Sequence, residues 1–142
     1  MKGTNTFEGA GYLIRRLQQE IRNDMDKTLG RYDLTPPQFA TLLTLKLKSE
    51  ASNADLARAS FVTPQTMVRI IANLEAAELI KKKNDPVHGR ILKIELTEKG
   101  EKLITKCQSL VGEHIEGKIL KGFSKTEAQQ FKDLLSKSLK NF

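Results

Sequence analysis

Residues 52–97 read SNADLARASFVTPQTMVRIIANLEAAELIKKKNDPVHGRILKIELT and decide the fold of this chain. The stretch contains two closely spaced helix starts. In the first, Ser52 and Asp55 have the spacing of a capping box, in which both side chains accept hydrogen bonds from amides of the first turn. In the second, Thr63 can cap, and Pro64 suits the first helical position because its φ is preset. Only about three residues separate the two helices, which is the turn length of a helix-turn-helix.

The second of these helices is predicted to be amphipathic. Its apolar side chains recur at helical spacing, and its polar side chains are spaced to gather on the opposite side. Amide and guanidinium groups can bond base edges, hydroxyls can bond bases or phosphates, and a helix N-terminus favours an anion. The polar side therefore suits a DNA major groove, although any solvated helix face has a similar composition. The candidate DNA contacts on this helix are Thr63, Gln65, Thr66, Arg69 and Asn73.

The residues after this helix predict a basic β-hairpin. The lysines at 81–83 lead into a turn-rich segment at 84–89, and an alternating strand follows at 92–96. From Lys81 to Lys93 there are five basic residues and one acidic residue, a local charge of +4 with histidine neutral. A basic hairpin directly after a recognition helix indicates a wing that enters the narrow minor groove. The candidate DNA contacts on the wing are Lys82, His88 and Arg90.

Short motifs spread over nearly the whole chain carry a family resemblance. They are LTPPQF at 34–39, DLA at 55–57, TPQTM at 63–67, LE at 74–75, DPVHGR at 85–90 and LTEKG at 96–100. Together they resemble the MarR family of winged helix-turn-helix regulators. The resemblance implies homodimers joined through N- and C-terminal helices, with a ligand pocket between those helices and the winged module. Residues that could line this pocket, and are equally plausible as packing residues, are Tyr12, Arg16 and Phe39.

Three positions depart from that family pattern. Phe61 stands in the turn where many relatives have glycine, and Glu78 stands where a glycine usually closes the recognition helix. His88 replaces an acidic residue two positions before the wing arginine, Arg90. A neutral imidazole cannot supply the carboxylate partner that an arginine prefers, so the support of Arg90 is left open.

The segments outside 52–97 predict further helices. One runs from about residue 7 to 29 and ends at Gly30, and another starts at a capping box of Thr35 and Gln38. A long helix is expected from Thr97 to about Leu120, ended by Gly122, and a last one after the capping box at 124–127. The buried side of the second helix is predicted to comprise Phe39, Leu42, Leu43 and Leu47, and the carboxylates of Glu20, Asp24 and Asp26 are read as a solvated face.

These elements predict a mainly α fold with a small β-hairpin wing. We expect residues 1–142 to form a single unit, in which a winged helix-turn-helix at about 35–97 is flanked by dimerisation helices at about 7–30 and 98–141. The flanking apolar stripes exceed what a chain of 142 residues can cover by itself, so a second copy is the expected partner.

Composition limits the other functions. The net charge of +7 favours a polyanionic partner. Cys107 is the single cysteine, so no internal disulfide forms, and the chain lacks an apolar run long enough to cross a membrane; we expect a cytoplasmic protein. The two histidines, His88 and His114, match no local metal signature, and no catalytic constellation is present. We expect no enzyme activity, no metal and no cofactor.

Two hypotheses of different classes remain. The first is a dimeric DNA-binding regulator, a repressor released by a small ligand, that recognises a pseudo-palindromic operator in double-stranded DNA. The second is a winged-helix module for protein association without sequence-specific DNA binding. The combination of Gln65, Thr66, Arg69 and Arg90 favours the first, because these side chains form a set suited to bases and phosphates.

Overall fold

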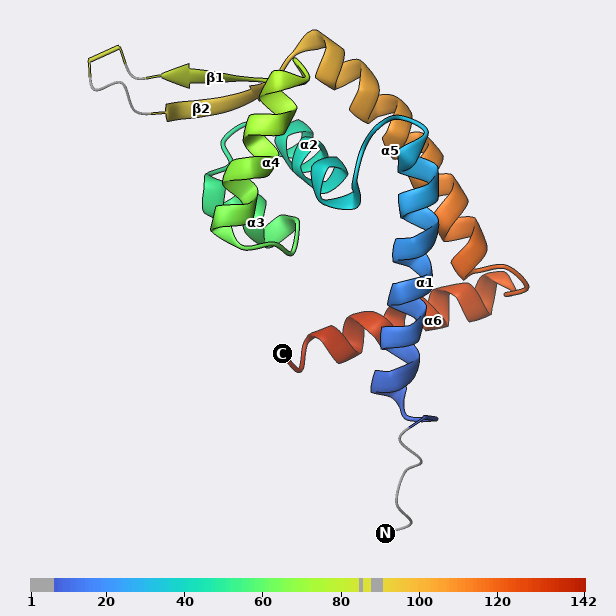
Figure 1. Cartoon of the computed structure of the whole chain (residues 1–142). Helices are drawn as coiled ribbons and strands as arrows, with labels where there is room; N and C mark the ends of the chain where they lie inside the picture. Colours follow the sequence, from blue (N-terminus) through green and yellow to red (C-terminus); the bar gives the residue numbers. More distant parts are fainter. Residues whose placement is uncertain (1–6, 85, 88–90) are drawn as a thin grey trace.

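A computed structural model describes residues 7–84, 86–87 and 91–142. Six helices and one hairpin follow one another along these residues (Figure 1). Their bounds are α1 Ala10–Gly30, α2 Pro36–Leu47, α3 Asn53–Ala59, α4 Pro64–Ala76, β1 Ile80–Asn84, β2 Ile91–Leu96, α5 Glu98–Ile119 and α6 Lys125–Leu139. The predicted mainly α fold with a β-hairpin wing is confirmed.

Side-chain caps set the starts of five helices. In each, the hydroxyl of the N-cap residue accepts a hydrogen bond from the backbone amide three residues further on, which pairs an amide that the first turn leaves free. The reciprocal bond of a capping box is also formed at α2, α3 and α6. The N-cap residues are Thr35, Ser52, Thr63, Thr97 and Ser124, as the sequence predicts.

Helix α2 occupies the centre of the molecule, in contact with α1, α3, α4, α5 and β2. Phe39, Leu42 and Leu45 are buried on it. Its buried Thr41 donates a hydrogen bond to the Pro37 carbonyl at 2.8 Å. The expectation that Leu47 is buried was wrong: its side chain is 69% exposed, because it ends α2 at the surface and Leu45 turns inward instead.

Three helix ends are closed by a residue other than glycine in the left-handed region. Asp33, Phe61 and Glu78 have φ of 55°, 53° and 59°. After α3 the amide of Phe61 bonds the Arg58 carbonyl and the amide of Val62 bonds the Ala57 carbonyl, the hydrogen-bond pattern of a Schellman motif. Gly30 is the last residue of α1, as the sequence predicts, but the left-handed position after this helix is taken by Asp33.

The hairpin pairs its two strands antiparallel, with Lys81 opposite Glu95 and Lys83 opposite Lys93. Successive side chains of a strand point to opposite faces, so Ile80 and Ile94 are buried against the helices while Lys81, Lys83, Lys93 and Glu95 lie on the outer face. The hairpin extends away from the helices beside α4 (Figure 1).

Helices α1, α5 and α6 carry apolar side chains that this chain leaves uncovered. No residue of α6 is buried, and α1 buries only Leu29. Among the described residues, no helix is both long enough and apolar enough to cross a membrane. The uncovered apolar side chains include Leu13, Ile14, Leu17, Leu110, Leu134, Leu135 and Leu139.

Candidate nucleic-acid interface

Helix α4 separates its apolar and polar sides as the sequence predicts. Met67, Ile70, Ile71 and Leu74 are buried. The five predicted contact residues are all exposed, so the structure brings Thr63, Gln65, Thr66, Arg69 and Asn73 to the open side of one helix and its N-cap.

The start of α4 presents two threonine side chains to solvent. The Oγ1 atom of Thr63 accepts a hydrogen bond from the amide of Thr66 at 3.2 Å, and its hydroxyl donates to Oγ1 of Thr66 at 3.0 Å. Thr63 is thereby fixed as a cap, and Gln65 and Thr66 follow Pro64 in the first turn of α4. A helix N-terminus with partly positive amides and exposed hydroxyls is suited to a phosphate group.

The outer face of the hairpin, formed by Lys81, Lys83, Lys93 and Glu95, is positively charged. The Glu95 carboxylate lies 3.1 Å from the ammonium groups of both Lys83 and Lys93, and 3.9 Å from that of Lys81. Hydrogen bonds from Lys93 and then Lys83 lower the pKa of Glu95. One carboxylate therefore holds three lysines in position, and their surplus positive charge faces the surroundings.

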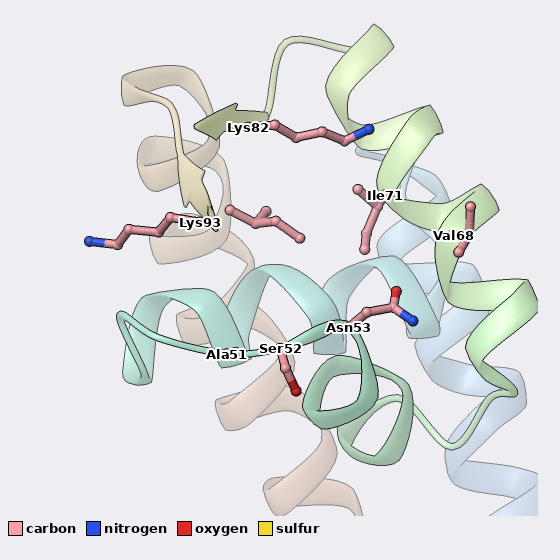
Figure 2. Close-up of a pocket in the computed structure, with 8 residues that line it drawn as sticks. Ala51, Ser52, Asn53, Val68, Ile71, Lys82 and Lys93 are labelled. Carbon is pink, nitrogen blue, oxygen red and sulfur yellow. The ribbon is translucent and has the colours of Figure 1, made fainter. Parts of the chain in front are cut away.

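Lys82 lies on the other face of β1, at a pocket of about 480 Å³ between the start of α3, helix α4 and the hairpin. Figure 2 shows its ammonium group reaching toward α4, whereas Lys93 points away from the pocket. The ammonium is 3.4 Å from the Glu75 carboxylate of α4, and the Lys82 side chain is only 25% exposed. Lys82 thus joins the wing to the recognition helix, a contact that the sequence pattern did not indicate.

His88 and Arg90 lie outside the described residues. Their expected contacts at the tip of the wing remain predictions.

A second pocket, of about 300 Å³, lies between α1, α2 and the turn that joins α3 to α4. Of the three predicted ligand candidates, Phe39 lines it, whereas Tyr12 and Arg16 do not. These two lie nearer the start of α1, where a guanidinium nitrogen of Arg16 donates to the Tyr12 hydroxyl at 3.4 Å. The pocket lining is mostly apolar, with Gln18 and Arg22 of α1 as its exposed polar members.

Sequence reasoning missed Arg22 and the contribution of Phe61 to this pocket. Arg22 falls off the apolar stripe of α1, and Phe61 is visible in the sequence only as a replacement for glycine. Both reach the pocket because the turn before α4 packs near the middle of α1 and the start of α2.

The reading of Asp24 as a solvated carboxylate was wrong. One carboxylate oxygen is 2.6 Å from the Lys118 ammonium and the other is 2.8 Å from Nε2 of His114, so Asp24 ties α1 to α5. The hydrogen bond from Lys118 is the main cause that lowers the pKa of Asp24.

Burial raises the pKa of the Cys107 thiol. Within the described residues, no cluster of three or more metal-ligating side chains is found.

Comparisons with known proteins agree with this geometry. Residues 32–91 match the family model described as MarR family. The chain is 30% identical to the HTH-type transcriptional repressor Rv2887 of Mycobacterium tuberculosis over 127 residues, which cover 89% of this chain and 91% of that protein.

Two solved structures of proteins similar in sequence share the fold of this chain. The MepR–DNA complex of Staphylococcus aureus superposes with a TM-score of 0.77 at 29% identity, over 97% of this chain and 99% of that chain. The complex of Rv2887 with p-aminosalicylic acid superposes with a TM-score of 0.77 at 29% identity, over 91% and 97% of the two chains.

Proposed function

The chain belongs to the MarR family of helix-turn-helix transcriptional regulators, and on this premise we propose that it is a dimeric, sequence-specific DNA-binding repressor released by a small aromatic acid. The observation that carries the proposal is the open polar side of α4, whose opposite side is anchored in the core. The MepR–DNA complex and the Rv2887 complex with p-aminosalicylic acid support it, as relatives of the same fold that bind these two kinds of partner.

Helix α4 enters the major groove in this proposal. Arg69 and Asn73 read base edges, because guanidinium and amide groups can form paired hydrogen bonds to them, while Thr63 and Thr66 meet the phosphate backbone. Lys81, Lys83 and Lys93 add positive charge near the flanking phosphates, and Arg90 enters the minor groove. Lys82 and His88 complete the interface, Lys82 also through its ion pair with Glu75.

A second copy of the chain completes the regulator. The uncovered apolar side chains of α1, α5 and α6 need a partner, and a second copy supplies the same face in return. Residues 1–142 then act as one unit, with the winged module at about 35–97 held by dimerisation helices at about 7–30 and 98–141. Two recognition helices related by a two-fold axis require half-sites about 10 bp apart, so the operator is a pseudo-palindrome. The regulator binds it in the cytoplasm.

The pocket between α1, α2 and the α3–α4 turn is the effector site that we propose. Its volume of about 300 Å³ suits a molecule of one or two rings, and the apolar lining suits an aromatic body. Arg22 can pair with a carboxylate at the pocket edge. An effector there contacts the turn that positions α4, so binding can alter operator affinity.

Selection from random DNA duplexes tests the function. The full chain is expected to enrich a two-fold symmetric sequence, and its affinity should fall linearly on a log–log plot as salt rises, because bound phosphates release counterions. In Arg69→Ala, binding to the enriched sequence should weaken by about 1–3 kcal/mol, with a flatter preference among sequence variants. Arg31→Ala is the matched control, since Arg31 is exposed at the end of α1, away from α4. Failure to enrich any sequence, together with salt-independent association, would favour the protein-association alternative.

A further inference from the structure

Phe61 combines two unfavourable features. It has a φ of 53°, in the left-handed region that disfavours side chains with a Cβ, and its side chain is 96% exposed. The Schellman hydrogen bonds after α3 require the left-handed backbone, but they do not require an aromatic ring. The ring therefore adds nothing to the hydrophobic core, and glycine would form the same turn with less strain.

The surroundings of the ring suggest what covers it. Phe61 is one of the residues that line the pocket between α1, α2 and the α3–α4 turn. Phe39, buried on α2, contributes a second aromatic ring to the same pocket, and Arg22 contributes a positive charge. Residues held in sparsely populated backbone conformations cluster at ligand clamps, and an exposed ring at a pocket edge has the form of a clamp.

We propose that Phe61 is the specificity-determining residue of this pocket, where its ring packs on the aromatic ring of a bound aromatic acid. The inference rests on the proposed effector site and names the residue that selects the ligand. Aromatic pairs are more favourable than their buried area alone predicts, so a planar aromatic acid should bind better than its saturated analogue. The preference should be about fivefold.

The position of Phe61 also connects the ligand to DNA binding. Two residues further on, Thr63 caps α4, and the intervening Val62 is hydrogen-bonded to the carbonyl of Ala57 in α3. A ligand held by the ring therefore acts directly on the joint between the two helices of the helix-turn-helix. A ligand shifts a conformational equilibrium only through differential affinity for its states, so loss of the ring should reduce both the binding preference and the ligand-induced release of DNA.

The test uses the full-length protein, the enriched DNA duplex and two probes, salicylate and 2-hydroxycyclohexanecarboxylate. The two acids carry the same substituents on an aromatic and a saturated ring. Direct titration gives the affinity for each probe, and fluorescence anisotropy of the labelled duplex gives DNA release. The variants are Phe61→Leu, which removes the ring, and Phe61→Tyr, which retains it. Phe142→Leu is the matched control, because Phe142 is fully exposed and does not line the pocket.

We expect Phe61→Leu to lose the fivefold preference for salicylate while its DNA affinity without ligand stays within about twofold of the wild type. Phe61→Tyr and Phe142→Leu should keep the preference. An unchanged preference in Phe61→Leu overturns the role of the ring, as does a loss of DNA affinity without any change in preference, which would mean that Phe61 contacts DNA. A wild-type protein that binds the duplex but neither probe would instead overturn the effector site itself.

Discussion

Among the glycines that the structure describes, Gly100 in the first turn of α5 is predicted to be the one whose replacement destabilises the fold most. A Cβ added there would lie 2.0 Å from the carbonyl oxygen of Leu79 and 3.0 Å from its carbonyl carbon. The same oxygen accepts a hydrogen bond from the amide of Thr97 at 3.1 Å, and the Thr97 hydroxyl caps α5 through the amide of Gly100 at 3.0 Å. The turn between α4 and β1 and the start of α5 are therefore held in contact through backbone atoms, which cannot rotate away as a side chain can.

The clash sets the size of the effect. To reach even the shortest tolerable separation of 3.0 Å, Gly100→Ala must move the two backbone segments apart by about 1.0 Å. Overpacking of this kind costs about 3 kcal/mol, so the melting temperature should fall by about 10 °C. Thermal unfolding followed by circular dichroism, at one protomer concentration, measures the change.

Gly112→Ala is the control for Gly100→Ala. It lies in the same helix with no atom within 4 Å of its added Cβ, so it should gain up to about 1 kcal/mol of stability from helix propensity. A Gly100→Ala protein that melts within about 1 °C of the wild type would refute the packing argument.

Three further predictions follow from the strained turns, the α1–α5 ion pair and the uncovered helices. In denaturant unfolding, Phe61→Gly and Glu78→Gly should each stabilise the fold by about 0.5–1 kcal/mol. Asp33→Gly should stabilise it by less, because aspartate tolerates the left-handed region better. Equal effects at all three positions would contradict this reasoning. The pKa of Asp24 is lowered in the folded state, so the stability that its charge contributes to the fold is present at neutral pH and is lost as the pH falls below the ordinary value of 3.8. The difference in melting temperature between wild type and Asp24→Asn should therefore narrow over that range. A constant difference would argue against the ion pair. Leu135→Asp places a charge on the apolar face of α6, which costs several kcal/mol if this face lies in an interface. Sedimentation should then find monomers or unfolded chain. A folded dimer that binds the full operator would show that the interface lies elsewhere.

The sequence predicted features that depend on neighbours within one helical turn. A hydroxyl three residues before its amide partner forms a cap through local geometry alone, and Thr35, Ser52, Thr63, Thr97 and Ser124 all do so. The amphipathic pattern of α4 was equally readable, because the period of the helix assigns each residue to a side.

Features that depend on distant segments were not predictable in the same way. Asp24 meets His114 and Lys118 only because α1 and α5 lie side by side, some ninety positions apart in the chain. Lys82 reads as one of three equivalent lysines in the sequence, yet strand alternation turns it toward Glu75 while its neighbours face outward. Periodicity places a side chain on a face, but only the fold determines what that face meets.

The recognition helix is bracketed by two strained turns, and this arrangement bears on its regulation. Phe61 precedes α4 and Glu78 follows it, each in the left-handed conformation at a cost of about 1–2 kcal/mol. The four buried side chains of α4 offset this cost by fixing the helix against the core, while hydrogen bonds from Thr97 and Lys99 to the carbonyls of Glu78 and Ala77 hold its far end. At the near end, the buried hydroxyls of Ser60 and Thr41 are hydrogen-bonded at 3.1 Å and Asn53 of α3 donates to the Pro64 carbonyl at 3.5 Å, while the ring of Phe61 stays exposed. A ligand that packs on Phe61 contacts the turn between α3 and α4, and under the proposed function it releases DNA only to the extent that it binds one position of α4 more tightly than the other.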